Sequence, residues 1–194
     1  MTRSLLSRLC VTLFTLITLI IAGCHSVDDE RIPYAEVRLT FATVGDWNRY
    51  GIGGAGDCKR FIYTRDLRTP ADYPYTSLDR TGYGGLLLAM DAMGNLVVYD
   101  LACPYEARAN IRINVAEGAT YAECPDCGST YEIYTNYGLP LSGPAARLGY
   151  ALKRYSSHSG GALEYLVITR KPLTSPRQRK NTSCRGLLSR GRAP

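Results

Sequence analysis

Residues 123–145 read ECPDCGSTYEIYTNYGLPLSGPA, and most of what the sequence predicts follows from them. Cys124 and Cys127 are three positions apart and are followed directly by Gly-Ser, which is typical of a tight turn that points both thiols to one side. Upstream, Cys103-Pro104 closes a predicted strand with a second turn. Small β domains hold zinc or iron with cysteine-bearing loops at the tips of adjacent hairpins. We therefore expect the two loops to lie side by side.

Alternating apolar and polar residues predict strands on both sides of these loops. Ala35–Thr43 has the period of a half-buried strand, and 84–91 and 96–100 flank a Gly-Asn turn that suits a hairpin. Further strands are predicted at 59–64, 110–115, 120–124, 129–135, 149–155 and 162–169, the last two separated by a turn at 156–161. Nothing beyond the N-terminal segment has a convincing helical period. We therefore predict an all-β domain, with the Gly-rich residues 46–57 as a flexible loop.

The residues around the cysteines resemble a known pattern. In Rieske iron–sulfur domains, Cys-x-His is followed by Cys-x-x-His-Gly-Ser-x-Phe/Tyr, and then by Gly-x-Pro and Gly-Pro-Ala. Residues 96–155 are similar to this pattern, with Cys103 and Cys124 at the two family cysteines. The two family histidines are replaced, by Tyr105 at the first position and Cys127 at the second. The remaining matches are Gly128, Ser129, Tyr131, Gly143, Pro144 and Ala145.

The resemblance implies a Rieske-like antiparallel β-sandwich that carries a small two-loop subdomain for the metal centre. In a Rieske centre, two thiolates hold one iron of a [2Fe–2S] cluster and two imidazoles hold the other. The resemblance further implies that Ser129 faces a bridging sulfide, that Tyr131 faces a cysteine sulfur, and that Tyr105 lies beside the ligands. Hydrogen bonds from such hydroxyl groups would stabilise the reduced form of the centre.

Three interpretations of the altered ligand set stay open at this point. One is a [2Fe–2S] cluster on Cys103, Cys124 and Cys127, with a fourth ligand from Tyr105, Glu106 or elsewhere. The second is a single zinc or iron ion on the three thiolates, because Cys-Pro-x-Cys is a knuckle-like turn. The third is a Rieske scaffold without a metal, in which Cys124 or Cys127 forms a disulfide with Cys103, since a cell-surface position permits disulfides.

The sequence favours electron transfer over catalysis. Its two histidines, His25 and His158, lie in a polar segment and in a Ser/Gly-rich turn, so no catalytic base is evident and we predict no enzyme. Cys124 and Cys127 are followed by a predicted strand, whereas a thioredoxin-type dithiol precedes a helix. We expect a ferredoxin-type electron carrier or its degenerate descendant. The alternative is a metal-free binding or structural module on the same scaffold.

The net charge of +6 is unevenly distributed along the 194 residues. Residues 170–194 carry eight Lys/Arg and no acidic residue, whereas residues 25–169 have thirteen basic and seventeen acidic residues, a net charge of −4. The basic balance therefore belongs to the C-terminal segment, and the domain itself is not expected to bind nucleic acid. Residues 171–194 lack an apolar period, so we predict a disordered basic tail.

The N-terminal segment predicts a lipid anchor. Two arginines precede an apolar run at 9–22 that is too short to favour a spanning helix, and Gly23-Cys24 follows it. This segment resembles a bacterial lipobox, which implies that residues 1–24 are a lipoprotein signal peptide and that Cys24 is lipidated. An ordinary signal peptide or a signal anchor are the alternatives. Lipid chains would hold the domain, predicted at 34–170, to a membrane.

Residues 25–33 are predicted to be a tether between lipid and domain. Asp28-Asp29-Glu30 resembles the surface-export tag of Bacteroidetes lipoproteins, and no aspartate follows Cys24 to retain the protein in the inner membrane. A solvated linker is the alternative interpretation of these acidic residues. We expect an outer-membrane lipoprotein of the cell envelope, exposed at the surface, with a redox or protein partner that the sequence does not specify.

Overall fold

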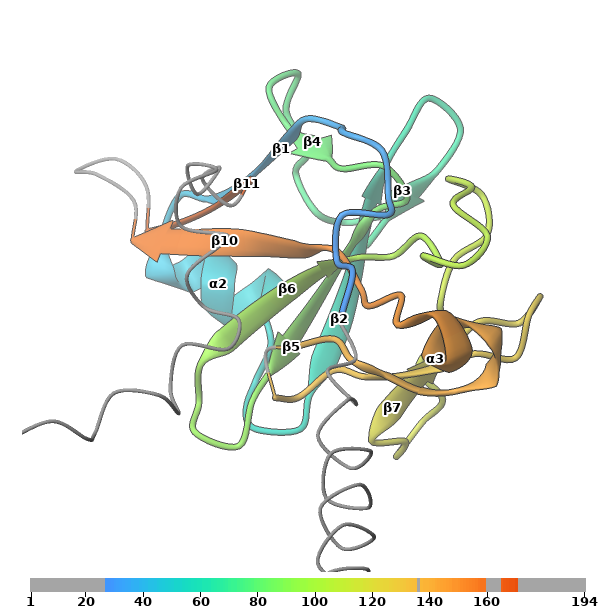
Figure 1. Cartoon of the computed structure of the whole chain (residues 1–194). Coiled ribbons are helices and arrows are strands. Elements are labelled where there is room, and N and C mark those ends of the chain that lie inside the picture. Colours follow the sequence, from blue (N-terminus) through green and yellow to red (C-terminus); the bar gives the residue numbers. More distant parts are fainter. Residues whose placement is uncertain (1–26, 136, 160–164, 171–194) are drawn as a thin grey trace, which may run out of the picture.

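The computed structural model describes residues 27–135, 137–159 and 165–170 (Figure 1). The predicted signal peptide with its lipidated Cys24, and the predicted basic tail, lie outside the described residues. The described part is mostly β structure with two short helices, which confirms the all-β prediction at the level of fold class. No helix in this part of the chain is long and apolar enough to cross a bilayer.

Within these residues the strands form two antiparallel sheets. The larger sheet has the order β3-β2-β5-β6-β10-β11-β1-β4 and the smaller sheet has the order β7-β8-β9. The larger sheet contains β1 (Val37–Phe41), β2 (Cys58–Tyr63), β3 (Arg68–Thr69), β4 (Arg80–Thr81), β5 (Leu86–Met90), β6 (Leu96–Asp100), β10 (Arg154–Ser159) and β11 (Leu166–Arg170). The smaller sheet contains β7 (Tyr121–Glu123), β8 (Thr130–Glu132) and β9 (Pro140–Ser142).

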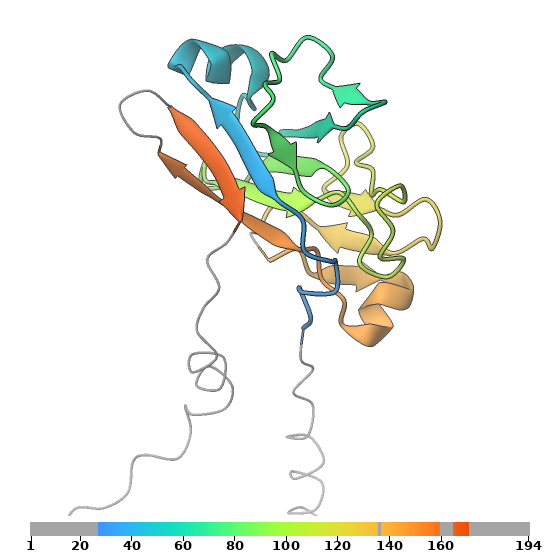
Figure 2. The same cartoon turned by 90° about the horizontal axis from the view of Figure 1, so that it is seen from above.

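The larger sheet is curled rather than flat (Figure 2). The backbone N–H of Tyr63 in β2 donates a hydrogen bond of 3.0 Å to Thr81 Oγ1 in β4. These two strands stand near opposite ends of the strand order, so the bond brings the two ends of the sheet together. The edge strands β3 and β4 are only two residues long, which leaves little unpaired backbone for another chain to pair with.

Two hydrophobic cores lie on the two faces of the larger sheet, and β5 separates them. Leu86 and Leu88 pack in one core with Phe41 and Phe61. Leu87 and Ala89 pack in the other core, which also contains side chains of the smaller sheet. A strand covered on both faces needs apolar residues at successive positions, which explains why β5 reads Leu-Leu-Leu-Ala-Met instead of alternating.

The prediction of a loop over residues 46–57 is wrong for its first part, because Val44–Tyr50 forms helix α2. A capping box begins this helix: Asp46 N–H donates to Thr43 Oγ1 at 3.0 Å, and Thr43 N–H donates to Asp46 Oδ2 at 3.0 Å. The pattern Thr-x-x-Asp is readable in the sequence and resembles the capping-box pattern Ser/Thr-x-x-Glu. Gly143, Pro144 and Ala145, which match the Rieske pattern, form the start of helix α3 (Gly143–Leu148).

Two predicted strands also differ from the structure. The strand predicted at 149–155 begins only at Arg154, and residues 156–159, predicted as a turn, continue it as β10. The polar run Ser-Ser-His-Ser is held in a strand by pairing with β11, for example His158 opposite Val167. Residues 110–115 form only isolated bridges, Ala102 to Arg112 and Asn114 to Glu123, because they pass between the two sheets instead of extending either one.

Candidate metal centre

The structure brings together the three cysteines that the sequence predicted to meet. The Sγ atoms of Cys103, Cys124 and Cys127 all lie within 4.8 Å of one another, and those of Cys103 and Cys127 are 3.7 Å apart. Cys103 and Cys124 are completely buried, whereas Cys127 is partly exposed. All three are free thiols, and none of them forms the disulfide with Cys103 that was considered for the metal-free scaffold.

The end of β6 fixes where the first cysteine loop begins. The buried Asp100 carboxylate accepts four hydrogen bonds, from the backbone N–H groups of Tyr83, Gly84 and Ala102 at 2.9, 2.9 and 2.8 Å, and from the Tyr155 hydroxyl at 2.6 Å. Burial raises the pKa of this carboxyl, and the four donors oppose that rise. Since Asp100 ties three chain segments to one point, the loop that starts at Ala102 leaves the sheet in a fixed direction.

The first loop is a tight turn closed on itself. Cys103 N–H donates to the Ile111 carbonyl at 2.9 Å, and Ala107 N–H donates to the Cys103 carbonyl at 2.8 Å. The backbone N–H of Glu106 points at the Cys103 sulfur. Ala107 has a φ of 50°, which is unusual for a residue with a side chain and marks the sharp reversal of the turn.

The second loop has the form of a metal knuckle. Gly128 N–H donates to the Cys124 carbonyl, and Cys124 N–H donates to the Ser129 carbonyl, both at 2.9 Å. The backbone N–H groups of Asp126 and Cys127 point at the Cys124 sulfur. Gly128 has a φ of 66°, a left-handed conformation that glycine adopts at no steric cost. The turn therefore surrounds Cys124 with donors that would stabilise a thiolate.

Two buried hydroxyl groups contact the sulfurs, and Ser129, which the resemblance places opposite a bridging sulfide, here contacts the Cys127 thiol. Tyr131 Oη lies 3.3 Å from Cys103 Sγ, and the Cys127 thiol donates to Ser129 Oγ at 3.2 Å. Ser129 Oγ also accepts a bond of 3.1 Å from Ala145 N–H. Helix α3 is thereby attached to the cysteine loops, and Ala145 lies in the same core cluster as Cys103.

Neither residue predicted as a fourth ligand is placed with the sulfurs. Tyr105 is 38% exposed, and in the described part of the chain its hydroxyl makes no hydrogen bond to any of the three thiols. The Glu106 carboxylate accepts a bond of 3.0 Å from Arg108, which also lies 3.6 Å from Asp126. This ion pair links the two cysteine loops on their outer side.

The three thiols differ in acidity. Burial raises the pKa of Cys124 to about 12, and burial also raises the pKa of Cys103. Burial alone would raise the pKa of Cys127, but donors from Ser129 and the neighbouring thiols outweigh it and lower this pKa. Metal binding requires thiolates, so a metal would displace protons from the two buried thiols.

The spacing of the sulfurs fits a tetrahedral metal ion. Metal–sulfur bonds of about 2.3 Å at tetrahedral angles place sulfur atoms about 3.8 Å apart. The Cys103 to Cys127 separation of 3.7 Å agrees with this value. A small contraction of the other separations, which are at most 4.8 Å, would complete one face of a tetrahedron. The residues present therefore fit an ion that prefers thiolates.

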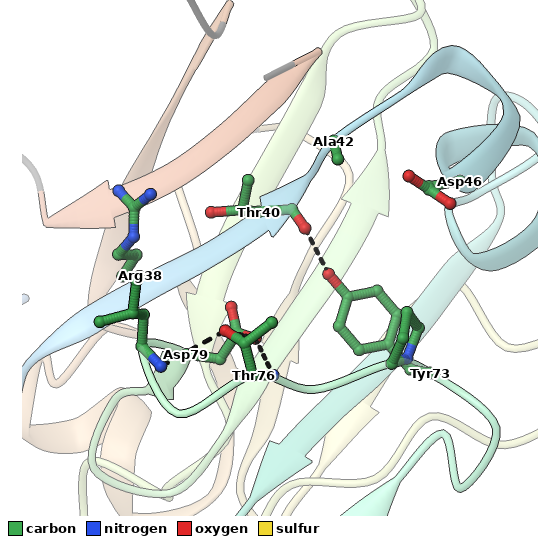
Figure 3. Close-up of a pocket in the computed structure, with 9 residues that line it drawn as sticks. Arg38, Thr40, Ala42, Asp46, Tyr73, Thr76 and Asp79 are labelled. Atoms are coloured by element: carbon green, nitrogen blue, oxygen red, sulfur yellow. Dashed lines mark hydrogen bonds between the residues drawn. The ribbon is translucent and has the colours of Figure 1, made fainter. Parts of the chain in front are cut away.

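A separate cavity of about 370 Å³ lies on the outer side of β1 (Figure 3). Two of its polar groups are bonded within the protein: the Tyr73 hydroxyl donates to the Thr40 carbonyl at 2.6 Å, and Asp79 accepts from Thr76 N–H at 2.6 Å. Thr40 Oγ1 has no hydrogen-bond partner among the described residues. None of the three clustered cysteines lines it. Cys58 is a free, partly exposed thiol and lines another cavity together with Tyr134.

The sequence matches no known family model, and comparisons with curated proteins and with solved structures found no significant match. The functional interpretation therefore depends on the three thiols, the hydroxyl groups that contact them, and the backbone donors of the two turns.

Proposed function

We propose that this protein is an electron carrier of the cell envelope that holds one thiolate-bound iron ion on Cys103, Cys124 and Cys127. The observation that carries the proposal is the convergence of the three Sγ atoms within 4.8 Å of one another. Soft thiolate ligands select iron or zinc over magnesium or calcium. Iron bound there would alternate between two oxidation states that differ by one electron.

The mutual closeness of the sulfurs favours one ion over a two-iron cluster. In a [2Fe–2S] cluster the ligands are divided between two irons, and sulfurs on different irons are farther apart than sulfurs on the same ion. Three sulfurs that are all mutually close fit a single ion better. The resemblance to Rieske domains is the argument for the cluster, and the metal stoichiometry distinguishes the two.

The residues around the sulfurs support a redox role. Tyr131, at 3.3 Å from Cys103 Sγ, and Ser129, at 3.2 Å from Cys127 Sγ, can donate to thiolates, as can the backbone N–H groups of both turns. Such bonds offset the negative charge of the sulfurs and raise the reduction potential of a thiolate centre. Burial of two of the sulfurs limits access of water.

The lipoprotein assignment is part of the same proposal. It is supported by the apolar run at 9–22 that ends in Gly23-Cys24. We expect the mature chain to begin at Cys24 with lipid attached, and mass spectrometry of its N-terminal peptide tests this directly. A mature N-terminus at any other residue would contradict it.

The test of the metal centre uses full-length protein, purified anaerobically in mild detergent and assayed for iron, zinc and acid-labile sulfide. We expect one iron for each chain and no sulfide. Cys103→Ser and Cys127→Ser should lose the iron, whereas Cys58→Ser, a partly exposed thiol outside the cluster, should keep it.

Each other outcome of this assay contradicts a defined part of the proposal. Two irons with two sulfides would show a cluster instead of a single ion. Zinc without iron would support the metal site but contradict the role in electron transfer, because zinc does not change its oxidation state. A chain that binds no metal after anaerobic reconstitution would overturn the metal centre and favour a binding or structural module.

A further inference from the structure

The N-terminal residues of the described chain are bonded to the domain instead of extending away from it. Asp28 N–H donates to the Gly149 carbonyl, and Ala151 N–H donates to the Asp28 carbonyl, both at 2.9 Å, which forms a parallel bridge beside the end of α3. Four residues later, Ile32 is only 1% exposed. Much of the stretch predicted as a tether is thus held against the domain surface.

The acidic residues of this stretch have basic partners on the domain. Asp29 lies 3.2 Å from Arg154, and Glu30 lies 3.3 Å from Lys153, whose Nζ also donates to the Ile32 carbonyl at 2.9 Å. The Arg31 guanidinium stacks over the ring of Tyr150 at 5.2 Å. Successive residues from 28 to 32 therefore all contact the domain.

From these contacts we infer that the side of the domain around the end of α3 faces the lipid bilayer. The inference rests on the proposed lipidation of Cys24. Asp28 follows Cys24 by four residues, and an extended chain spans about 3.5 Å per residue, so the lipid attachment lies within about 14 Å of Asp28. A free tether from 24 to 33 would reach about 32 Å and would leave the domain free to turn.

The surface next to Asp28 carries exposed apolar and basic side chains, a combination that favours contact with a bilayer. Leu148, the last residue of α3, is 51% exposed, and Val27 is 50% exposed. Arg31 and Arg147 are exposed beside them. We call these four residues the anchor face. Apolar side chains that enter the headgroup region and basic side chains that meet anionic phosphates both favour lipid as the occupant.

The C-terminal end of the described chain lies close to the same place. Arg170 is opposite Tyr155 in the pairing of β10 with β11, and Arg154 is the residue that binds Asp29. Residues 171–194 add seven Lys/Arg and no acidic residue. This positive charge starts near the anchor face, where anionic headgroups would attract it. Because the proposed lipid attachment lies next to this positive charge, an anionic bilayer is the occupant that the arrangement favours.

The experiment uses tryptophan fluorescence, because the chain has one tryptophan, Trp47. Figure 2 places α2, which contains it, on the side of the domain opposite α3. Two variants in a Trp47→Phe background are compared: Leu148→Trp on the anchor face, and Val44→Trp in α2 as the control. The replaced side chains are matched in exposure, at 51% and 52%.

Full-length lipidated protein is reconstituted into phosphatidylethanolamine–phosphatidylglycerol vesicles, with and without bromine on the upper acyl chain. We expect bromine to lower the emission of Leu148→Trp at least twofold and to leave Val44→Trp unchanged. Asp29→Asn with Glu30→Gln should reduce the difference between the two positions, because it removes the ion pairs that hold residues 28–32.

Several results would overturn the inference. Equal quenching at both positions would show a domain that turns freely, and no quenching at either would show a domain held away from the bilayer. An emission change at Leu148→Trp that needs no lipid and depends on protein concentration would show a second copy on this face. If the protein does not bind vesicles, the proposed lipid anchor is contradicted and the inference with it. The iron content of the same sample still tests the metal centre independently.

Discussion

The two sheets of this protein differ in the length of their strands and in how many side chains they bury. The central strands of the larger sheet are the most buried, with four of five residues buried in both β5 and β6. Strands of the smaller sheet are three residues long, and β7 completely buries only Ala122. Apolar burial therefore stabilises the larger sheet on both faces, whereas the smaller sheet shares one of these cores and would gain further support from the proposed metal ion. The site occupies the region that is least able to fold alone.

The largest expected effect comes from breaking the core of the larger sheet. Phe41 is completely buried and makes edge contacts with Trp47, Phe61 and Tyr73. Phe41→Ala should lower the free energy of unfolding by about 4 kcal/mol, because it leaves a cavity among these rings. Urea unfolding followed by circular dichroism measures this, and both sheets should be lost in one transition. A separate, unshifted transition for the smaller sheet would contradict the comparison.

Withdrawal of the metal should affect the smaller sheet alone. Without the proposed ion, the three thiols would lose their common bond to it, and the short strands of the smaller sheet would lose part of their support. We expect hydrogen exchange of backbone amides in β7 and β8 to speed up at least about tenfold after anaerobic chelation, which corresponds to about 1.4 kcal/mol. Amides in β5 and β6 should keep their protection. An equal loss in both sheets would show that the centre supports the whole fold.

Removal of one hydroxyl group should weaken the centre without unfolding either sheet. Tyr131→Phe keeps the buried ring but loses the contact of 3.3 Å with Cys103 Sγ. Loss of such a bond to a ligand costs about tenfold in metal affinity. Competition with a chelator of known affinity measures it. Tyr134→Phe is the matched control, because the Tyr134 hydroxyl bonds the Cys58 thiol outside the cluster.

The smallest effect is expected at the turn between β5 and β6. Hydrogen bonds, first from the Asn95 side chain and then from nearby backbone N–H groups, lower the pKa of Asp91. A lowered pKa in the folded state means a stabilisation that is present above the unfolded value of about 3.9 and lost as pH falls through the folded value. Asp91→Ala should lower the melting temperature by about 1 °C at pH 7 and by less near pH 3. A constant difference across this range would contradict it.

The sequence predicted that the cysteines converge because both Cys-Pro turns can be recognised from neighbouring residues. Each Cys-Pro turn is determined by its own residues, and the strands that carry the turns have clear patterns, so the placement of Cys103 beside Cys127 followed. Helix α2 was also readable, from Thr43 and Asp46, and was missed because the glycines after it suggested a loop.

Other features could not be read locally. The polar residues of β10 belong to a strand only because β6 and β11 pair with it. The docking of residues 28–32 depends on Lys153 and Arg154, which are more than 120 positions away in the chain. An acidic stretch next to an apolar leader looks like a solvated linker until its distant partners are known.

The close contact between Gly143 and Ser129 restricts which residues can occupy position 143. Gly143 has a φ of 79°, and a Cβ atom there would lie 2.7 Å from Ser129 Cα and 3.1 Å from the Gly128 carbonyl. Any larger residue would push the start of α3 outward from Ser129. The hydrogen bond from Ala145 N–H to Ser129 Oγ, which attaches α3 to the cysteine loops, would then be stretched or lost. The absence of a Cβ atom at this position is what allows α3 to start directly against the second cysteine loop.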